Sequence, residues 1–379
     1  MRVMATADDA IMAKLSACLY GYYDDPFLSH FAQNARSSTH EGRQASSSLG
    51  QISAAPCRHS AGRSQDASGA QQQQPLIRRG THARVCCIDR AISSFLKLAA
   101  VSHNQIVILG SGKDTSYLRA KAGIIHHHSA DDSSSFAHLT QNTHWYEVDF
   151  SPLITSKCKL LSSCPSSHFT IVSVLDDTPS FSIATNDIST KKATANSSSH
   201  KFNYHLVSHD LNHSTKHLLS TLNKQFEFQF DSPTLFVMEC VQMYLPNSTT
   251  TEIFTAISTL CREPIIAIYD PILMNDQFGK VMESNLSRAG LINRDMSLIQ
   301  TRTLEQQFQK LKCTGFDQLL GCNMMEAYES IVTPQQRIRA NQCEMLDEIE
   351  EWILIMRHYC FIVAGKSSAS LSLPDSSIT

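Results

Sequence analysis

The segment from Gln105 to Leu118, QIVILGSGKDTSYL, joins an apolar, strand-like run to a glycine-rich turn that could hold a ligand. Gly110, Ser111 and Gly112 follow the apolar residues directly. Such a turn could hold the pyrophosphate of a dinucleotide, the phosphates of a nucleoside triphosphate, or a ligand without phosphate. The P-loop pattern is absent, and Thr115 stands where a dinucleotide fingerprint has its third glycine. Both phosphate-binding interpretations are therefore weak.

Acidic residues near the ends of later apolar segments supply further hydrogen-bond acceptors. Asp149 lies in HWYEVDF, Asp210 follows in KFNYHLVSHDL, and Glu239 lies inside TLFVMECVQMYL. A carboxylate at the end of the strand after a glycine turn can accept hydrogen bonds from both hydroxyls of a ribose. This set of residues favours an adenosine ligand without phosphates, and S-adenosylmethionine is the candidate cofactor.

Apolar runs that alternate with amphipathic segments predict the fold that positions these residues. We expect strands at QIVILG, HWYEVDF, KFNYHLVSHDL, TLFVMECVQMYL and PIIAIYDPI, and helices at TSYLRAKAGI, TTTEIFTAISTL and FGKVMESNLSRAG. Strands separated by helices are joined by crossover connections into an open, parallel α/β sheet. Ligands of such sheets bind beyond the carboxyl ends of the strands, where the glycine turn and the acidic residues fall.

Composition excludes several other classes of protein. The 379 residues are 42% hydrophobic with a net charge of -3, and no run of five basic residues suggests nucleic-acid binding. No apolar run approaches the roughly 20 residues of a membrane-spanning helix. Asp8 and Asp9 stand where a signal peptide would be apolar. We therefore expect a soluble, cytoplasmic protein that contacts neither membrane nor nucleic acid.

Cysteine and histidine patterns give no sign of a metal site or a disulfide framework. The 12 cysteines include no Cys-x-x-Cys pair, so most are expected to be small buried side chains. His126 to His128 lie in a polar stretch, where a solvated loop is favoured over a metal site. We assign no metal.

Polar, low-complexity stretches suggest how the chain is divided. Residues 1–34 are expected to form an N-terminal helical segment, and 35–77 a disordered insertion rich in Ser, Gln, Gly and Ala. The main domain then covers 78–366, with polar insertions near 120–142 and 185–200, and a disordered tail covers 367–379.

Several longer stretches resemble the leucine carboxyl methyltransferases, which methyl-esterify the C-terminal leucine of the type 2A protein phosphatase catalytic subunit. The similarity runs in order along nearly the whole chain outside the polar insertions. Its most specific segments are RGTHARV, MECVQMY and MRHYC. The resemblance implies a class I S-adenosylmethionine-dependent methyltransferase: a Rossmann-like sheet with helices on both faces and extra N-terminal helices. It also implies that the phosphatase is the partner, and we expect a monomer.

The resemblance further implies roles for individual residues. Lys14 and Arg84 would lie near the methionine end of the cofactor, with Gly110 and Gly112 in the adjoining turn. Asp149 would hold the ribose, and Asp210 with Leu211 would lie beside the adenine. Glu239 would complete the cofactor site, while Tyr244 would approach the acceptor, which makes Arg84 and Tyr244 the catalytic candidates. The chain departs from the family pattern at Lys113, where methionine is usual, and at AIYDP.

Other interpretations of the same residues stay open at this point. Lys14 could be surface charge, Arg84 could form a structural ion pair, and Tyr244 could belong to the core. Glu239 in an apolar run needs a partner or a ligand, because an unpaired buried carboxylate is costly. Alternative functions are methylation of a tRNA wybutosine precursor or of a small-molecule acid, or cofactor binding without catalysis. The tRNA wybutosine methyltransferases carry a C-terminal array of repeats, and this sequence shows no such repeat.

Overall fold

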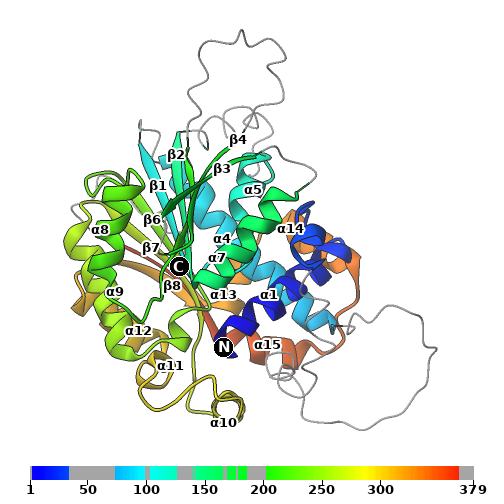
Figure 1. The fold of residues 1–379 in the computed structure, drawn as a ribbon. Helices are drawn as coiled ribbons and strands as arrows, with labels where there is room; N and C mark the ends of the chain where they lie inside the picture. The colour runs from blue at the N-terminus through cyan, green and yellow to red at the C-terminus, as the bar shows by residue number, and fades with distance from the viewer. Residues whose placement is uncertain are drawn as a thin grey trace.

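The computed structural model describes residues 2–33, 73–98, 103–125, 140, 142–164, 169–175, 178–185 and 202–366. A nine-stranded sheet in the order β3-β4-β5-β2-β1-β6-β7-β9-β8 forms their centre (Figure 1). The strands are β1 (Asn104–Leu109), β2 (Thr143–Asp149), β3 (Phe169–Leu175), β4 (Ser180–Thr185), β5 (Tyr204–Ser208), β6 (Thr234–Glu239), β7 (Pro264–Pro271), β8 (Gln318–Asn323) and β9 (Tyr359–Gly365).

The middle of the sheet is parallel, as the alternation of strands and helices predicted. β1 pairs with β2 and β6, β2 pairs with β5, and β6 pairs with β7, all in parallel. Both edges are antiparallel: β4 and β3 extend the sheet beyond β5, and β9 and β8 extend it beyond β7. The sequence pattern predicts none of these four edge strands.

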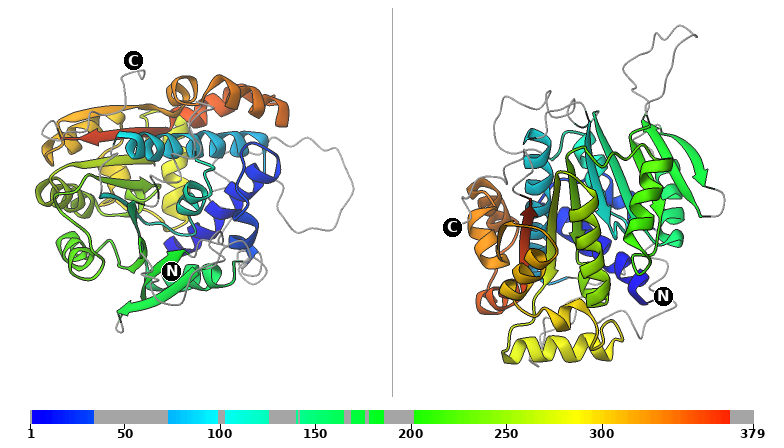
Figure 2. Two further views of the ribbon diagram at one scale, coloured as in Figure 1. Left: turned by 90° about the horizontal axis from the view of Figure 1, so that it is seen from above. Right: turned by 90° about the vertical axis from the view of Figure 1, so that its left-hand side faces the viewer.

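Helices cover both faces of the sheet, as Figure 2 shows. The helices of the described residues are α1 (Arg2–Leu19), α2 (Leu28–Phe31), α4 (Pro75–Leu98), α5 (Ser116–Lys121), α7 (Ser151–Ser162), α8 (Thr215–Gln225), α9 (Asn247–Leu260), α10 (Gln277–Arg288), α11 (Ser297–Gln300), α12 (Leu304–Cys313), α13 (Met324–Ser330), α14 (Pro334–Cys343) and α15 (Ile349–Arg357), with a 3₁₀ turn η1 (Gln242–Tyr244).

Alternate side chains of the central strand β1 belong to two different layers of the hydrophobic core. Ile106 and Ile108 pack with residues of α4 and α7, whereas Val107 and Leu109 pack with residues of α8 and α9. Successive side chains of a strand point to opposite faces, so a strand covered on both faces must be apolar throughout. That explains why the buried strands read as continuous apolar runs.

Two helices from distant parts of the sequence meet at the carboxyl end of the sheet. Arg2 at the start of α1 donates a hydrogen bond of 3.0 Å to the main-chain oxygen of Ala289, which follows α10. In Figure 1 both helices lie at the lower end of the molecule, away from the starts of β1 and β2. Helices α1 and α10 therefore meet at the end of the sheet where ligands of α/β sheets bind.

Helix α4 begins at Pro75, inside the segment that was predicted to be a disordered insertion up to residue 77. Leu76 is buried in the core and Arg78 pairs with Glu344, which explains why helix α4 includes residues before 78. Residues 34–72, 126–139, 186–201 and 367–379, which hold most of the predicted insertions and tail, lie outside the described residues. Within the described ranges, none of the helices has the length and apolar character needed to span a membrane.

Candidate active site

The glycine turn after β1 adopts a conformation that requires glycine. Gly110 and Gly112 have φ angles of +72° and +53°, and residues with a Cβ rarely adopt this backbone conformation. A Cβ on Gly110 would lie 2.6 Å from Cγ2 of Val241. The main-chain N–H groups of Gly110 and Ser111 both donate to the oxygen of Val148, at 2.8 and 3.2 Å. The turn is thus held against the end of β2 and the turn that follows β6.

Asp149, the last residue of β2, faces this turn. Its Oδ2 accepts a hydrogen bond of 2.6 Å from the N–H of Gly112, and its Oδ1 accepts one of 2.7 Å from the N–H of Phe150. Burial raises the pKa of Asp149, and the two N–H donors oppose that rise. Both carboxylate oxygens keep lone pairs that a ligand hydroxyl could use.

The residues predicted to contact the adenine follow β5, the strand next to β2. The N–H of His209 donates 2.9 Å to the main-chain oxygen of Asp149, so the two strand ends lie together. Oδ1 of Asp210 accepts hydrogen bonds of 2.9 Å from the main-chain and side-chain nitrogens of Asn212. Leu211 is buried beside it.

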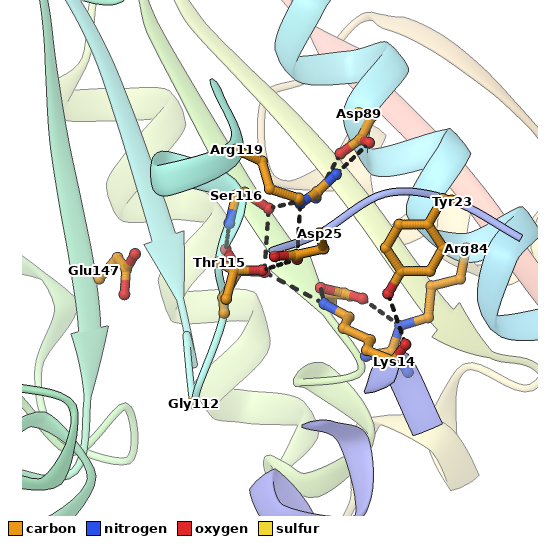
Figure 3. Close-up of polar contacts among 12 residues, drawn as sticks. Lys14, Tyr23, Asp25, Arg84, Asp89, Gly112, Thr115, Ser116, Arg119 and Glu147 are labelled. Carbon is orange, nitrogen blue, oxygen red and sulfur yellow. Dashed lines mark hydrogen bonds and ion pairs between the residues drawn. The ribbon is translucent and has the colours of Figure 1, made fainter. Parts of the chain in front are cut away.

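Four charged side chains meet at the ends of β1 and β6, and Figure 3 shows two of them, Lys14 and Arg84, close together. Oε2 of Glu239 lies 3.0 Å from Nζ of Lys14, and its Oε1 pairs with Nε of Arg84. Lys14 also lies 3.3 Å from Oδ2 of Asp114. Burial opposes ionisation of Glu239, but Arg84 and Lys14 hold its pKa below the usual value. The cluster therefore carries two positive and two negative charges.

These contacts give Lys14, Arg84 and Glu239 partners within the protein, including the ion pair that was the alternative interpretation of Arg84. The partner that a buried Glu239 was expected to need consists of Arg84 and Lys14, which come from α4 and α1. Lys14 is not free surface charge, since it reaches two carboxylates. The three predicted residues are brought together, although they are far apart in the sequence.

Aromatic side chains line the other side of Arg84. Its guanidinium lies 5.1 Å from the centre of the Tyr269 ring, which stacks on Tyr359 at 5.5 Å. Tyr244 in η1 is half-buried and contacts Thr6 of α1. Burial raises the pKa of Tyr244 above its usual value, so its hydroxyl keeps its proton at neutral pH. It can donate a hydrogen bond but cannot serve as a base.

Several residues that support the site were not predicted. Oγ1 of Thr115 donates 2.6 Å to Asp25, and Arg119 of α5 forms paired hydrogen bonds of 2.6 and 2.8 Å with Asp89 of α4 (Figure 3). Arg119 also lies 3.4 Å from Asp25. The only sequence signals were the Asp-Thr pair after the glycine turn and the two aspartates of GYYDDP. This network ties the glycine turn to α4 and to the loop after α1.

Glu147, two residues before Asp149 on β2, forms an ion pair inside the core. It is fully buried and pairs with Lys157, and Oε1 accepts a hydrogen bond of 2.8 Å from Tyr204. In Figure 3 it stands apart from the cluster around Lys14. The unexpected Lys113 also has a partner, because its Nζ lies 2.6 Å from Asp8 of α1.

The site has the donors and acceptors that S-adenosylmethionine requires. The glycine turn packs closely against Val241 and Ala7, and the hydroxyl oxygen of Ser111 is buried with no hydrogen-bond partner among the described residues. Paired opposite charges suit the zwitterionic methionine end, and Asp149 suits a ribose. Among the described residues no group of His, Cys, Asp or Glu is placed to hold a metal ion.

Sheet order and site together define a class I S-adenosyl-L-methionine-dependent methyltransferase. The chain belongs to the leucine carboxyl methyltransferase family, whose model matches residues 2–258. It is an enzyme of carboxyl methylation with S-adenosyl-L-methionine as its methyl donor.

Curated relatives match along almost the whole chain. Leucine carboxyl methyltransferase 1 of Aspergillus fumigatus is 28% identical, with 97% of this chain and 83% of the relative covered. The Caenorhabditis elegans protein of the same name is 25% identical (96% and 90% covered), and the Rattus norvegicus protein is 24% identical (98% and 92%). A solved Haemonchus contortus phosphoethanolamine N-methyltransferase 2, in complex with S-adenosyl-L-methionine, is 13% identical with a TM-score of 0.38, covering 73% and 52%.

Proposed function

We propose that this protein methyl-esterifies the C-terminal leucine of the type 2A protein phosphatase catalytic subunit. The observation that carries the proposal is the convergence of three sequence motifs at the carboxyl end of the sheet. RGTHARV supplies Arg84, MECVQMY supplies Glu239 and Tyr244, and MRHYC supplies Tyr359. Arg84 pairs with Glu239, and Tyr359 stacks on the tyrosine that lies under Arg84.

The acceptor places a modest chemical demand on the enzyme. A C-terminal carboxyl has a pKa of roughly 3.3 to 3.7, so it is already an anion at neutral pH. No general base is required, which agrees with a Tyr244 hydroxyl that stays protonated. A neutral hydroxyl can orient the acceptor oxygen without neutralising it, whereas a strong ion pair in the ground state would weaken it as a nucleophile.

When bound, S-adenosyl-L-methionine supplies an electrophilic methyl group. In this proposal Lys14 and Arg84 would hold its carboxylate, and Glu239 with Asp114 its amino group. Asp149 would hold the ribose, with Asp210 and Leu211 beside the adenine. Each group is buried or half-buried and fixed by a neighbour, so the site can align two reactants at small entropic cost.

Helix α1 would keep water away from the reacting groups. The methyl carbon of Ala7 lies 3.4 Å from the position of a Cβ on Gly112, and the ion pair between Asp8 and Lys113 fixes the helix on the glycine turn. Thr6 reaches Tyr244 on the acceptor side. Closing a site in this way strengthens its electrostatic interactions and prevents hydrolysis.

Labelling of the phosphatase tests the proposal. The purified chain is incubated with methyl-labelled S-adenosylmethionine and the phosphatase catalytic subunit, and base-labile label is counted. We expect label on the intact subunit and on the order of ten- to a hundredfold less on a variant that ends in alanine, because a leucine side chain gains more from burial. An unrelated folded protein that ends in leucine serves as the control. Equal labelling of that control would show that the phosphatase is not the specific partner.

A further inference from the structure

Lys157 on α7 is a charged side chain with no access to solvent. Its exposed fraction is 0%, as is that of Glu147, its ion-pair partner on β2. Burying an ammonium group is costly unless every donor has a partner. Glu147 satisfies part of this need and is itself held by the hydroxyl of Tyr204 at 2.8 Å.

The second partner of Lys157 lies in the glycine turn. Nζ donates a hydrogen bond of 2.6 Å to the main-chain oxygen of Asp114. Asp114 is also the residue whose carboxylate lies 3.3 Å from Lys14 and accepts a 2.8 Å bond from the N–H of Ser116 at the start of α5. Lys157 thus fixes the backbone of a residue that both ends the turn and orients a charged group of the site.

A buried ion pair is weak evidence for stability, because replacing it with apolar groups of similar shape is often neutral or stabilising. Its contact with the turn suggests another reason for its presence. Lys157 is too deeply buried to touch a bound cofactor, so any influence on the cofactor must act through Asp114.

We propose that Lys157 is a positioning residue for the cofactor, acting by holding the main chain of the 110–115 turn in its binding conformation. Glu147, itself held by Tyr204, keeps the Lys157 ammonium within hydrogen-bonding distance of the main-chain oxygen of Asp114. The inference rests on the proposal that this turn holds the cofactor.

The test separates positioning from stability by a pair of variants. Lys157→Met alone leaves Glu147 buried without its cationic partner, with only the Tyr204 hydroxyl beside it, so it should lower the unfolding midpoint strongly. The double variant Lys157→Met, Glu147→Gln removes both charges and should recover most of that stability. Lys159→Met on the exposed side of the same helix is the matched control. Affinity for S-adenosylhomocysteine is measured by calorimetry, and stability by urea unfolding.

We expect the double variant to bind S-adenosylhomocysteine roughly ten- to a hundredfold more weakly than the unchanged protein and Lys159→Met, despite its recovered stability. If affinity recovers together with stability, or if Lys157→Met binds normally, Lys157 is only structural and the inference is wrong. A substitution at Gly112 distinguishes the underlying assumption. If the Gly112 variant binds weakly and the double variant binds normally, only the role of Lys157 is wrong. If both variants bind normally, the cofactor lies elsewhere.

Discussion

The main-chain N–H of Gly112 donates a 2.6 Å hydrogen bond to Oδ2 of Asp149, which joins the turn after β1 to the end of the neighbouring strand β2. The bond fixes the orientation of the carboxylate before any ligand arrives. It also makes the conformation of the turn and the position of the ribose acceptor depend on each other.

A first prediction concerns the glycine of this pair. Gly112→Ala should weaken S-adenosylhomocysteine binding at least about tenfold, because a Cβ would press on Ala7 of α1 and φ is +53°, so the turn would have to shift. Gly123→Ala is a matched control, since Gly123 has φ of +69° with nothing within 4 Å of its Cβ position. Both variants should lose similar stability from backbone strain. Calorimetry that shows equal affinities for the two would contradict the placement of the cofactor.

A second prediction concerns the carboxylate. Hydrogen bonds to a charged group contribute roughly 1.5 to 3 kcal/mol each, so Asp149→Ala should lower cofactor affinity by at least about tenfold. Asp149→Asn keeps one acceptor oxygen and should be milder. Calorimetric titration with S-adenosylhomocysteine checks this prediction. If the affinity of the alanine variant is within twofold of normal, another group holds the ribose.

A third prediction addresses Tyr244. Removing its hydroxyl by Tyr244→Phe should reduce kcat on the protein acceptor about five- to tenfold, because one hydrogen bond that orients the carboxylate is lost. Affinity for S-adenosylhomocysteine should stay unchanged. Tyr20→Phe, at an exposed residue that follows α1, is the control. A loss of cofactor affinity with normal kcat would move Tyr244 to the cofactor side of the site.

The central strands could be predicted from the sequence, because strands buried on both faces must be apolar for their full length and end in polar residues. The need of Glu239 for a partner was also predictable from its apolar surroundings, but only the structure shows that Arg84 and Lys14 are those partners. Local pattern indicated which residues lie at the carboxyl ends of β1, β2 and β6.

The edges of the sheet and the supporting network were not predicted, for a physical reason. β9 pairs with β7 across about a hundred residues, Ile265 opposite Gly365, and no local turn links them. Glu147 and Asp149 are two positions apart and so share a face of β2. Asp149 reaches the site and Glu147 meets Lys157 only because they lie at different points along the strand. The alternation of side chains predicts the face on which a residue lies, but not how far along the strand it is from the site.

A fourth prediction follows from Asp270, whose burial raises its pKa from 3.8 to about 7. Between about pH 4 and 7 the folded protein keeps a proton that the unfolded chain has lost, so this group makes stability fall as pH rises through that window. Asp270→Asn removes the effect. Urea unfolding should show the variant gaining roughly 2 to 3 kcal/mol relative to the unchanged protein between pH 5 and pH 8. A difference that does not vary with pH would contradict a protonated Asp270.

Methyl transfer to a free or an amidated C-terminus tests the central claim of carboxyl methylation most directly. The phosphatase catalytic subunit is prepared in both forms and incubated with the enzyme and methyl-labelled S-adenosylmethionine. An amide is a far poorer nucleophile than a carboxylate and lacks the negative charge that complements the methyl donor. We therefore expect base-labile label on the free form and none above background on the amidated form. Equal labelling of both would show that the methyl group goes to a side chain and that the leucine carboxylate is not the acceptor.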